Sequence, residues 1–154
     1  MDRGSYVKKV DFDAFKVDKF VPHLFSGIYR MSGCGASALS LMTGEVPLSM
    51  NREDWPSRFM AKHLRKRGFR VQKLTVCNLT SEAYVDHPIT RSHVVLARIK
   101  LIKGEASWVV LHDGMSYHNF EITQMRVYEM IDHPVLEAFL VSHPRWFLLP
   151  EKKR

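Results

Sequence analysis

Cysteine is scarce in this chain, and long apolar runs are missing. The 154 residues include two cysteines, Cys34 and Cys77, which are too few for the disulfide framework of a small secreted domain. No apolar stretch approaches the ~18 residues of a membrane span, and the N-terminal residues carry no signal-peptide core. We therefore expect a protein of a reducing compartment, the cytoplasm, with no membrane contact.

Motifs for metals and nucleotides are also missing. No Cys, His, Asp or Glu residues recur at the spacing of a zinc site. No glycine-rich loop follows a predicted strand, so a phosphate-binding loop of the nucleotide-binding type is excluded. The sequence thus predicts neither a metal ion nor a cofactor.

Basic residues, in contrast, are in excess. Lys and Arg number 23 against 16 Asp and Glu, which gives a net charge of +7 at pH 7. Such a balance is typical of proteins that bind nucleic acids or other acidic partners. The densest group of cations lies in residues 62–73 and consists of Lys62, Arg65, Lys66, Arg67, Arg70 and Lys73.

The cations of residues 62–73 have two interpretations. They can form a solvated helix face whose basic last turn complements the helix dipole. Alternatively, they contact phosphates or an acidic partner. Because no nucleic-acid motif accompanies them, the sequence favours a protein or peptide partner over nucleic acid.

The length and composition predict one globular domain. A chain of 154 residues fits the usual size of a single domain, and an apolar share of 45% excludes intrinsic disorder. We expect a single domain over residues 1–154, with its core in about 12–149 and a basic tail at 150–154.

Turn residues divide the chain into short elements. A short amphipathic segment should begin at Phe12, with Asp11 or Asp13 near its N-cap. The expected helices cover residues 34–44, from near Asp54 to Gly68, and 132–140. The expected strands cover residues 69–74, 93–102, 108–112, 117–122 and 146–149, with a tight hairpin at Asp113-Gly114. N-terminal helices packed on a C-terminal antiparallel sheet define an α+β fold.

Cys34 is the residue that best fits a chemical role. It stands at the first turn of the predicted helix 34–44 and is followed at once by Gly35. Unpaired backbone N–H groups and the positive end of the helix dipole favour the thiolate at such a position. The alternative is a small buried residue that begins a tightly packed helix.

A nucleophilic cysteine needs a base and a group that orients the base, and the sequence offers two arrangements. In the first, His93 begins one strand and Asp113 ends the next, so antiparallel pairing would bring them together beside Cys34. In the second, the base would stand at the start of the predicted strand 108–112, where the chain has Ser107. Its orienting partner would then be Asn119. Ser107 cannot act as a base at neutral pH, so the second arrangement describes an impaired site.

The residues around Cys34 resemble a known family. The run Gly33 to Leu39, which reads GCGASAL, is similar to the nucleophile motif of papain-like cysteine peptidases, closest to the double-glycine, bacteriocin-processing branch. Similar elements follow in the family's order, over about residues 22–149. They are the helix and strand of 64–74, the strand 107–111, the segment 117–119, and the closing helix and strand of 135–140 and 146–149. The chain also resembles small proteins of T-even-type phages.

The resemblance implies a papain-like fold with Cys34 as nucleophile. The chain departs from the family pattern at two positions. Ile28 stands where the family has a Gln that donates to the oxyanion, and Ser107 stands where it has the catalytic His. Loss of such a donor typically lowers the rate by ~10²–10³.

Two classes of function follow. The resemblance implies a phage protein of the bacterial host cytoplasm, either a weak thiol-dependent hydrolase or a degenerate pseudoenzyme that binds a host factor. If active, Cys34 would attack an acyl group, His93 would be the base and Asp113 would orient it. The alternative is a non-enzymatic protein that binds nucleic acid or an acidic host protein through residues 62–73.

Overall fold

The computed structural model of the chain describes residues 11–17, 20, 22, 34–45, 56–74, 92–100, 106–118, 121–124, 134–144 and 146. The predicted tail at 150–154 and most of the segment 21–33 lie outside them. This part of the chain contains no helix that is long and apolar enough to cross a bilayer.

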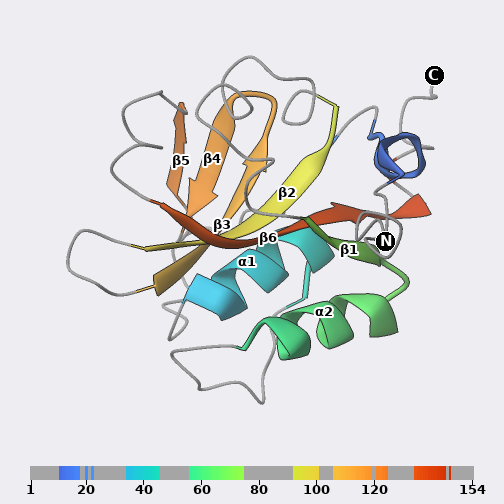
Figure 1. Ribbon diagram of the computed structural model, residues 1–154, viewed down its shortest axis with the longest axis horizontal. Coiled ribbons are helices and arrows are strands. Elements are labelled where there is room, and N and C mark those ends of the chain that lie inside the picture. Colours follow the sequence, from blue (N-terminus) through green and yellow to red (C-terminus); the bar gives the residue numbers. More distant parts are fainter. Residues whose placement is uncertain are drawn as a thin grey trace, which may run out of the picture.

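Helices and an antiparallel sheet make up the described residues, so the predicted α+β class is confirmed. The helical elements are η2 (Phe12–Phe15), α1 (Cys34–Thr43) and α2 (Ser57–Lys66). The strands are β1 (Arg70–Leu74), β2 (Val94–Lys100), β3 (Ala106–His112), β4 (Met115–His118), β5 (Glu121–Gln124) and β6 (Val135–Ser142). They form one sheet in the order β1-β6-β2-β3-β4-β5, in which every neighbouring pair is antiparallel (Figure 1).

Helix α1 is a buried helix, and its small residues allow it to lie close to the sheet. It packs against β3 and β4, and its side chains from Ala36 to Met42 are buried. The buried Ser40 hydroxyl donates to the Ala36 carbonyl at 2.8 Å, which satisfies a polar group that would otherwise be costly to bury. Gly44 follows the helix with φ 79°, the left-handed C-terminal cap that the sequence predicts.

Helix α2 ends at the predicted glycine. Gly68 has φ 86°, and the amide of Phe69 donates to the Leu64 carbonyl at 3.1 Å. This is the Schellman arrangement, in which a left-handed residue lets the chain reverse and satisfy the last carbonyls of the helix. The helix begins at Ser57, with Pro56 as its N-cap residue, slightly later than the expected start near Asp54. Asp54 lies outside the described residues.

Four of the predicted strands are present, one of them in two parts. Strands β1, β2 and β3 match the predicted strands 69–74, 93–102 and 108–112, and the Asp113-Gly114 hairpin follows. Asp113 and Gly114 have φ values of 49° and 77°, as a tight two-residue hairpin turn requires. The predicted strand 117–122 is instead two strands, β4 and β5, which pair with each other.

The predicted helix over 132–140 is wrong, because this segment contains strand β6. Leu136, Phe139 and Leu140 have helical spacing, yet β6 pairs with both β1 and β2 and occupies the interior of the sheet. Phe139 contributes to the core on one face of the sheet and Leu140 to the core on the other. Two buried faces and two pairing edges therefore override the helical pattern.

The chain after β6 also differs from the prediction. Trp146 is helical rather than the start of a strand. The remainder of the predicted strand 146–149 lies outside the described residues. The closing helix that the papain-like resemblance implies at 135–140 is therefore a strand in this structure.

The sheet separates two hydrophobic cores. Successive residues of a strand point to opposite faces, and on β2 Leu96 joins the core that contains α1 and α2, whereas Val95 joins the core that contains Phe15 of η2. Figure 1 shows α1 and α2 on one side of the sheet. We call this side the α face and the other side the η face. Every candidate residue on the sheet belongs to one face or the other.

Candidate functional site

Cys34 is the first residue of α1, as the sequence predicts. The first four N–H groups of a helix have no partner within it, and no acidic residue stands in the first turn of α1. The backbone at Cys34 thus has the polarity that a thiolate prefers. Whether a base reaches this position depends on where the histidines lie.

His93 lies on the η face of the sheet. Its imidazole Nε2 is 2.8 Å from the Phe12 carbonyl oxygen, and its ring meets the Phe12 ring edge-on at 5.7 Å. The side chain is buried, with 4% of its surface exposed. Because α1 packs on the α face, the sheet stands between His93 and the helix that begins with Cys34.

Side-chain contacts link His112, at the end of β3, to the region of the C-terminal end of α1. Met42, near that end of α1, lines a cavity together with Trp146. Trp146 contacts the Phe20 ring, which in turn contacts His112. Cys34 is the first residue of the ten-residue helix and stands at its other end.

His93 and Asp113 come from neighbouring strand ends. The β2–β3 register ends with Val95 opposite Leu111. His93 immediately precedes β2, and Asp113 immediately follows β3 in the exposed hairpin turn. The two residues therefore stand at the same end of this strand pair.

The second predicted arrangement, with Ser107 and Asn119, also places its first residue on the η face. Ser107 is buried in β3, opposite Ile99. It precedes Trp108, which faces the α side, so Ser107 lies on the η face like His93. Asn119 and Cys77 are outside the described residues.

Two buried polar atoms stand out on the η face. His93 Nδ1 and Ser142 Oγ have no hydrogen-bond partner among the residues that the structure describes. Val94 pairs with Val141, so one further step in the register places His93 beside Ser142. Unpaired buried polar atoms are rare in folded proteins. The sequence alone contains no signal that the start of β2 and the end of β6 lie side by side.

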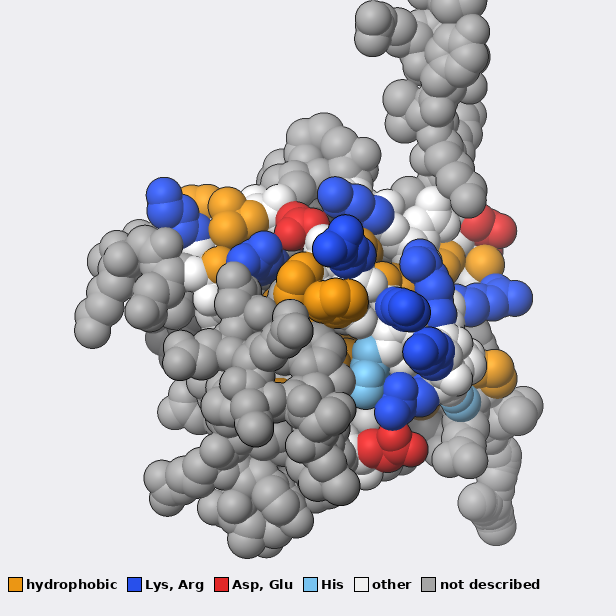
Figure 2. Space-filling model, turned by 90° about the horizontal axis from the view of Figure 1, so that it is seen from below, with side chains coloured by type: hydrophobic (Ala, Val, Ile, Leu, Met, Phe, Trp, Pro, Cys, Tyr) orange, Lys and Arg blue, Asp and Glu red, His pale blue; other side chains and the backbone are white. Residues whose placement is uncertain are grey.

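The basic surface is the strongest charge feature that the structure brings together. Four cations of α2 are exposed and are spaced at i, i+4, i+7 and i+8: Arg58, Lys62, Arg65 and Lys66. This spacing places them on one helix face, opposite the buried Met60 and Leu64. Figure 2 shows Lys and Arg side chains gathered on this side of the molecule. We call these four residues the α2 cation face.

Some cations of the predicted set have partners. Arg67 forms an ion pair with Glu45 at 2.8 Å, and Lys73 lies 3.7 Å from Glu137. Arg65 and Arg70 each donate to a backbone carbonyl, and neither forms an ion pair with a carboxylate of the described residues.

Arg58 is the cation that the sequence analysis missed. It stands four residues before Lys62, a spacing that could have revealed it, and its guanidinium lies 5.5 Å from the centre of the Phe59 ring. A cation held over an aromatic ring keeps its charge at a defined place on the surface.

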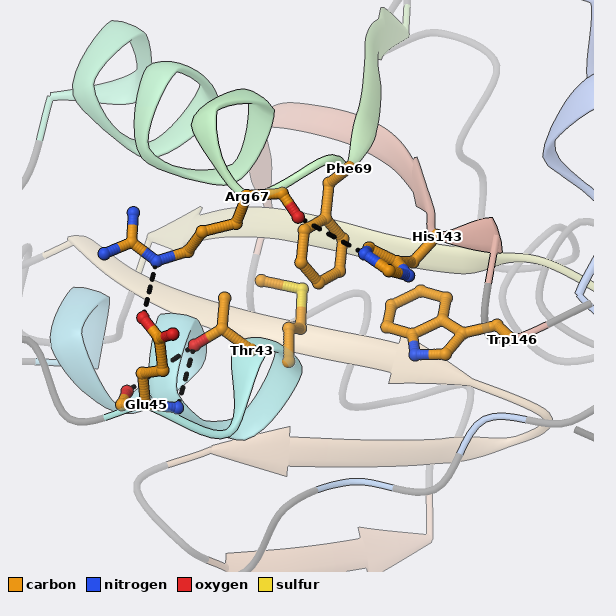
Figure 3. Close-up of a pocket in the computed structure, with 7 residues that line it drawn as sticks. Thr43, Glu45, Arg67, Phe69, His143 and Trp146 are labelled. Atoms are coloured by element: carbon orange, nitrogen blue, oxygen red, sulfur yellow. Dashed lines mark hydrogen bonds and ion pairs between the residues drawn. The ribbon is translucent and has the colours of Figure 1, made fainter.

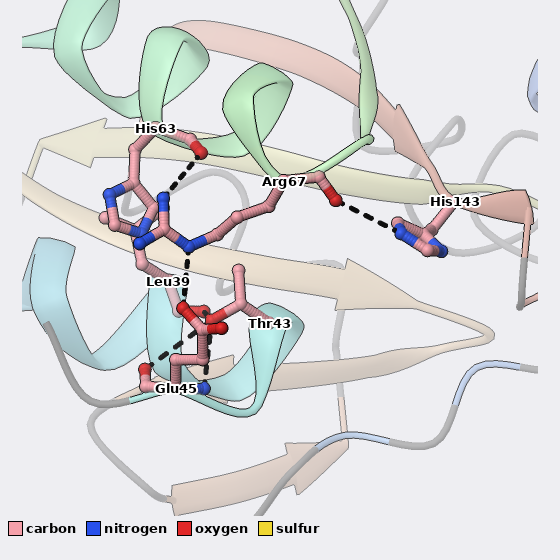
Figure 4. A network of polar contacts seen from close by, with 6 residues as sticks. All are labelled: Leu39, Thr43, Glu45, His63, Arg67 and His143. Carbon is pink, nitrogen blue, oxygen red and sulfur yellow. Dashed lines mark hydrogen bonds and ion pairs between the residues drawn. The ribbon is translucent and has the colours of Figure 1, made fainter.

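A polar network joins the ends of α1 and α2 (Figure 4). The Arg67 guanidinium donates to Glu45 and to the His63 carbonyl, and the Thr43 hydroxyl accepts from the Glu45 amide at 3.1 Å. The hydrogen bond and charge of Arg67 lower the pKa of Glu45. Burial, followed by the Arg67 charge, lowers the pKa of His63. Both causes favour the neutral form of the His63 imidazole.

Metal ligands do not gather in the described part of the chain, where no three His, Cys, Asp or Glu side chains come together. Comparison of the sequence and fold with protein-family models, curated proteins and solved structures gives no match.

The placement of His93 predicts that it does not activate Cys34. Replacing His93 by Gln, whose amide can still donate to the Phe12 carbonyl, should change the rate of Cys34 alkylation by less than about twofold. The rate is measured with iodoacetamide and mass spectrometry at neutral pH.

Asp113→Asn is the matched control, because Asn also tolerates the left-handed turn position. A fall in the Cys34 alkylation rate of about tenfold or more in both variants, with unchanged melting temperature, would mean that the three residues act together.

The lowered pKa of His63 predicts a pH-dependent stability. The unfolded chain takes up a proton near the ordinary histidine pKa of about 6.5, before the folded chain does. The free energy of unfolding should therefore fall as the pH drops through this value, and stop falling below the folded pKa. Urea unfolding of the original chain and of His63→Gln at neutral and mildly acidic pH measures this, and equal pH dependence in both proteins would contradict it.

Proposed function

We propose that the chain binds nucleic acid through the α2 cation face. The observation that carries the proposal is that Arg58, Lys62, Arg65 and Lys66 are exposed and that none of them forms an ion pair with a carboxylate of the described residues. Four uncompensated charges on one helix face repel each other, and an anionic partner relieves that repulsion.

The composition of the surface favours phosphates over an acidic protein. The cores of protein–protein interfaces contain aromatic and apolar anchors, whereas nucleic-acid interfaces are polar and strongly positive. Within the described residues, the large exposed hydrophobics are Phe12 on η2 and Leu136 on β6. Neither belongs to α2, so the α2 cation face has charge without apolar anchors.

The length of the cation face also suits a phosphate backbone. The segment from Arg58 to Lys66 rises about 12 Å along the helix. One nucleic-acid strand carries a charge about every 3.4 Å of duplex axis, so the face spans about three or four phosphates. Such contacts position a nucleic acid without reading its sequence.

A thiol function at Cys34 on a papain-like scaffold is the second candidate. It is supported by Cys34 as the first residue of α1 and by the antiparallel sheet that follows α1 in the chain. In this form the protein would be a weak hydrolase, or a pseudoenzyme, in the cytoplasm of a phage-infected bacterium. The positions of His93 and Ser107 on the other face of the sheet favour the nucleic-acid function over it.

Charge reversal on α2 tests the proposed function. Lys62→Glu combined with Lys66→Glu should lower the affinity for a short single-stranded oligonucleotide by more than about tenfold, because phosphate contacts supply most of non-specific binding. For the original chain, the logarithm of the binding constant should fall with the logarithm of salt concentration. The slope should be about −3, at about −0.7 for each phosphate neutralised by the four cations. Fluorescence anisotropy of a labelled oligonucleotide measures both quantities.

The matched control reverses two lysines outside α2 and β1. Lys16→Glu with Lys100→Glu makes the same change in net charge and should retain most of the affinity. An equal loss in both double variants would assign the binding to net charge alone. Binding of polyglutamate without binding of oligonucleotides would overturn the proposal in favour of an acidic protein partner.

A further inference from the structure

A cavity lies where α1 and α2 end (Figure 3). Its volume is about 310 Å³, at the lower end of the range of small-molecule sites. The residues that line it come from three separate parts of the chain: Met42, Thr43, Glu45, Arg67, Phe69, His143 and Trp146. The site is therefore formed by the tertiary fold and not by one local motif.

Aromatic rings form one wall of the cavity. The Phe69 and Trp146 rings meet at 76° with their centres 5.4 Å apart, and the Phe69 and His143 rings lie 4.5 Å apart. His143 Nε2 also lies 3.2 Å from the Arg67 carbonyl oxygen. Phe69 and Trp146 are largely buried, so the wall is held in place before any ligand arrives, which limits the entropic cost of binding.

Polar groups form the opposite side. Glu45 and Arg67 face the cavity as an ion pair, and their side chains remain 61% and 34% exposed. The Glu45 carboxylate can accept from ring N–H or amino groups, and the Arg67 guanidinium can donate to ring carbonyls or phosphate oxygens. Aromatic walls with a donor and an acceptor at the rim are the usual means of recognising a nucleobase.

The charge around the cavity selects an anionic ligand. Arg67 follows directly after Lys66, the last residue of the α2 cation face, and Arg70 lies just beyond it with no carboxylate partner among the described residues. The single acidic lining residue, Glu45, is already neutralised by Arg67. The surroundings are therefore net positive, as the phosphate of a nucleotide requires.

We infer that this cavity accepts one unstacked base of a nucleic-acid strand whose phosphates lie along the α2 cation face. The inference rests on the proposed function and deepens it, because it specifies single-stranded nucleic acid. A base in a duplex is paired and stacked, and removing it from the stack costs free energy, whereas the bases of a single strand are already accessible.

The test separates the contribution of the bases to the binding affinity from the contribution of the phosphate backbone. A labelled oligothymidylate is compared with an abasic strand of equal length and equal number of phosphates, and with a duplex of the same length. The oligothymidylate should bind about tenfold more tightly than the abasic strand, and the duplex should bind like the abasic strand, since stacking on aromatic residues contributes only where a base can enter.

A variant of the wall localises the effect. His143→Ala removes one ring without touching the α2 cation face, so it should reduce the preference for the oligothymidylate and leave the affinity for the abasic strand unchanged. Lys62→Glu with Lys66→Glu should weaken both. If His143→Ala fails to fold, the comparison of strands on the original chain still decides.

Two results would overturn the inference in different ways. Equal affinity of the original chain for the oligothymidylate and the abasic strand would remove the base site and leave the proposed function intact. Binding of neither strand would remove the proposed function together with the base site.

Discussion

The pairing of β6 with both β1 and β2 is the constraint on which the rest of the structure depends. β6 supplies hydrogen bonds along both of its edges, and its side chains enter both cores. It joins β1, which follows α2, to the strands of the second half of the chain. It also delivers His143 and Trp146 to the ends of the two helices. Without β6, β1 would have no strand partner among the described residues.

This division into two faces decides what chemistry the fold supports. Side chains at successive strand positions are committed to opposite sides, so His93 and Ser107 are sequestered with η2. Helix α2 turns Met60 and Leu64 toward the sheet, and the same helical period turns its cations toward solvent. The fold thus separates the predicted nucleophile from its predicted base, while it collects positive charge on one accessible surface.

Local signals in the sequence predicted the local features correctly. Gly68 and the Asp113-Gly114 pair adopt the backbone conformations that their residue types allow most easily, so the end of α2 and the β3–β4 hairpin follow from sequence. The segment with Leu136, Phe139 and Leu140 was misassigned because a strand that is buried on both faces needs no alternation, so its apolar residues can also have helical spacing. Only its long-range neighbours decide between helix and strand.

The candidate sites, too, could be predicted from the sequence only where their residues are close together in the chain. The cations of α2 are close in sequence, so most of them could be found from the sequence, although Arg58 was missed. The cavity joins Thr43, Arg67 and His143, which are far apart in the chain, and no pattern in the sequence relates them. His93 and Asp113 were correctly expected at adjacent strand ends, but the face of the sheet on which they lie depends on η2 and could not be predicted.

The most direct test of this account is to map the surface that contacts nucleic acid. Backbone amide signals of the isotope-labelled protein are followed by nuclear magnetic resonance while a short single-stranded oligonucleotide is added. The account predicts that the largest chemical-shift changes fall in residues 58–69, with changes at His143 and Trp146. Largest changes around Phe12 and His93, on the opposite face of the sheet, would contradict it.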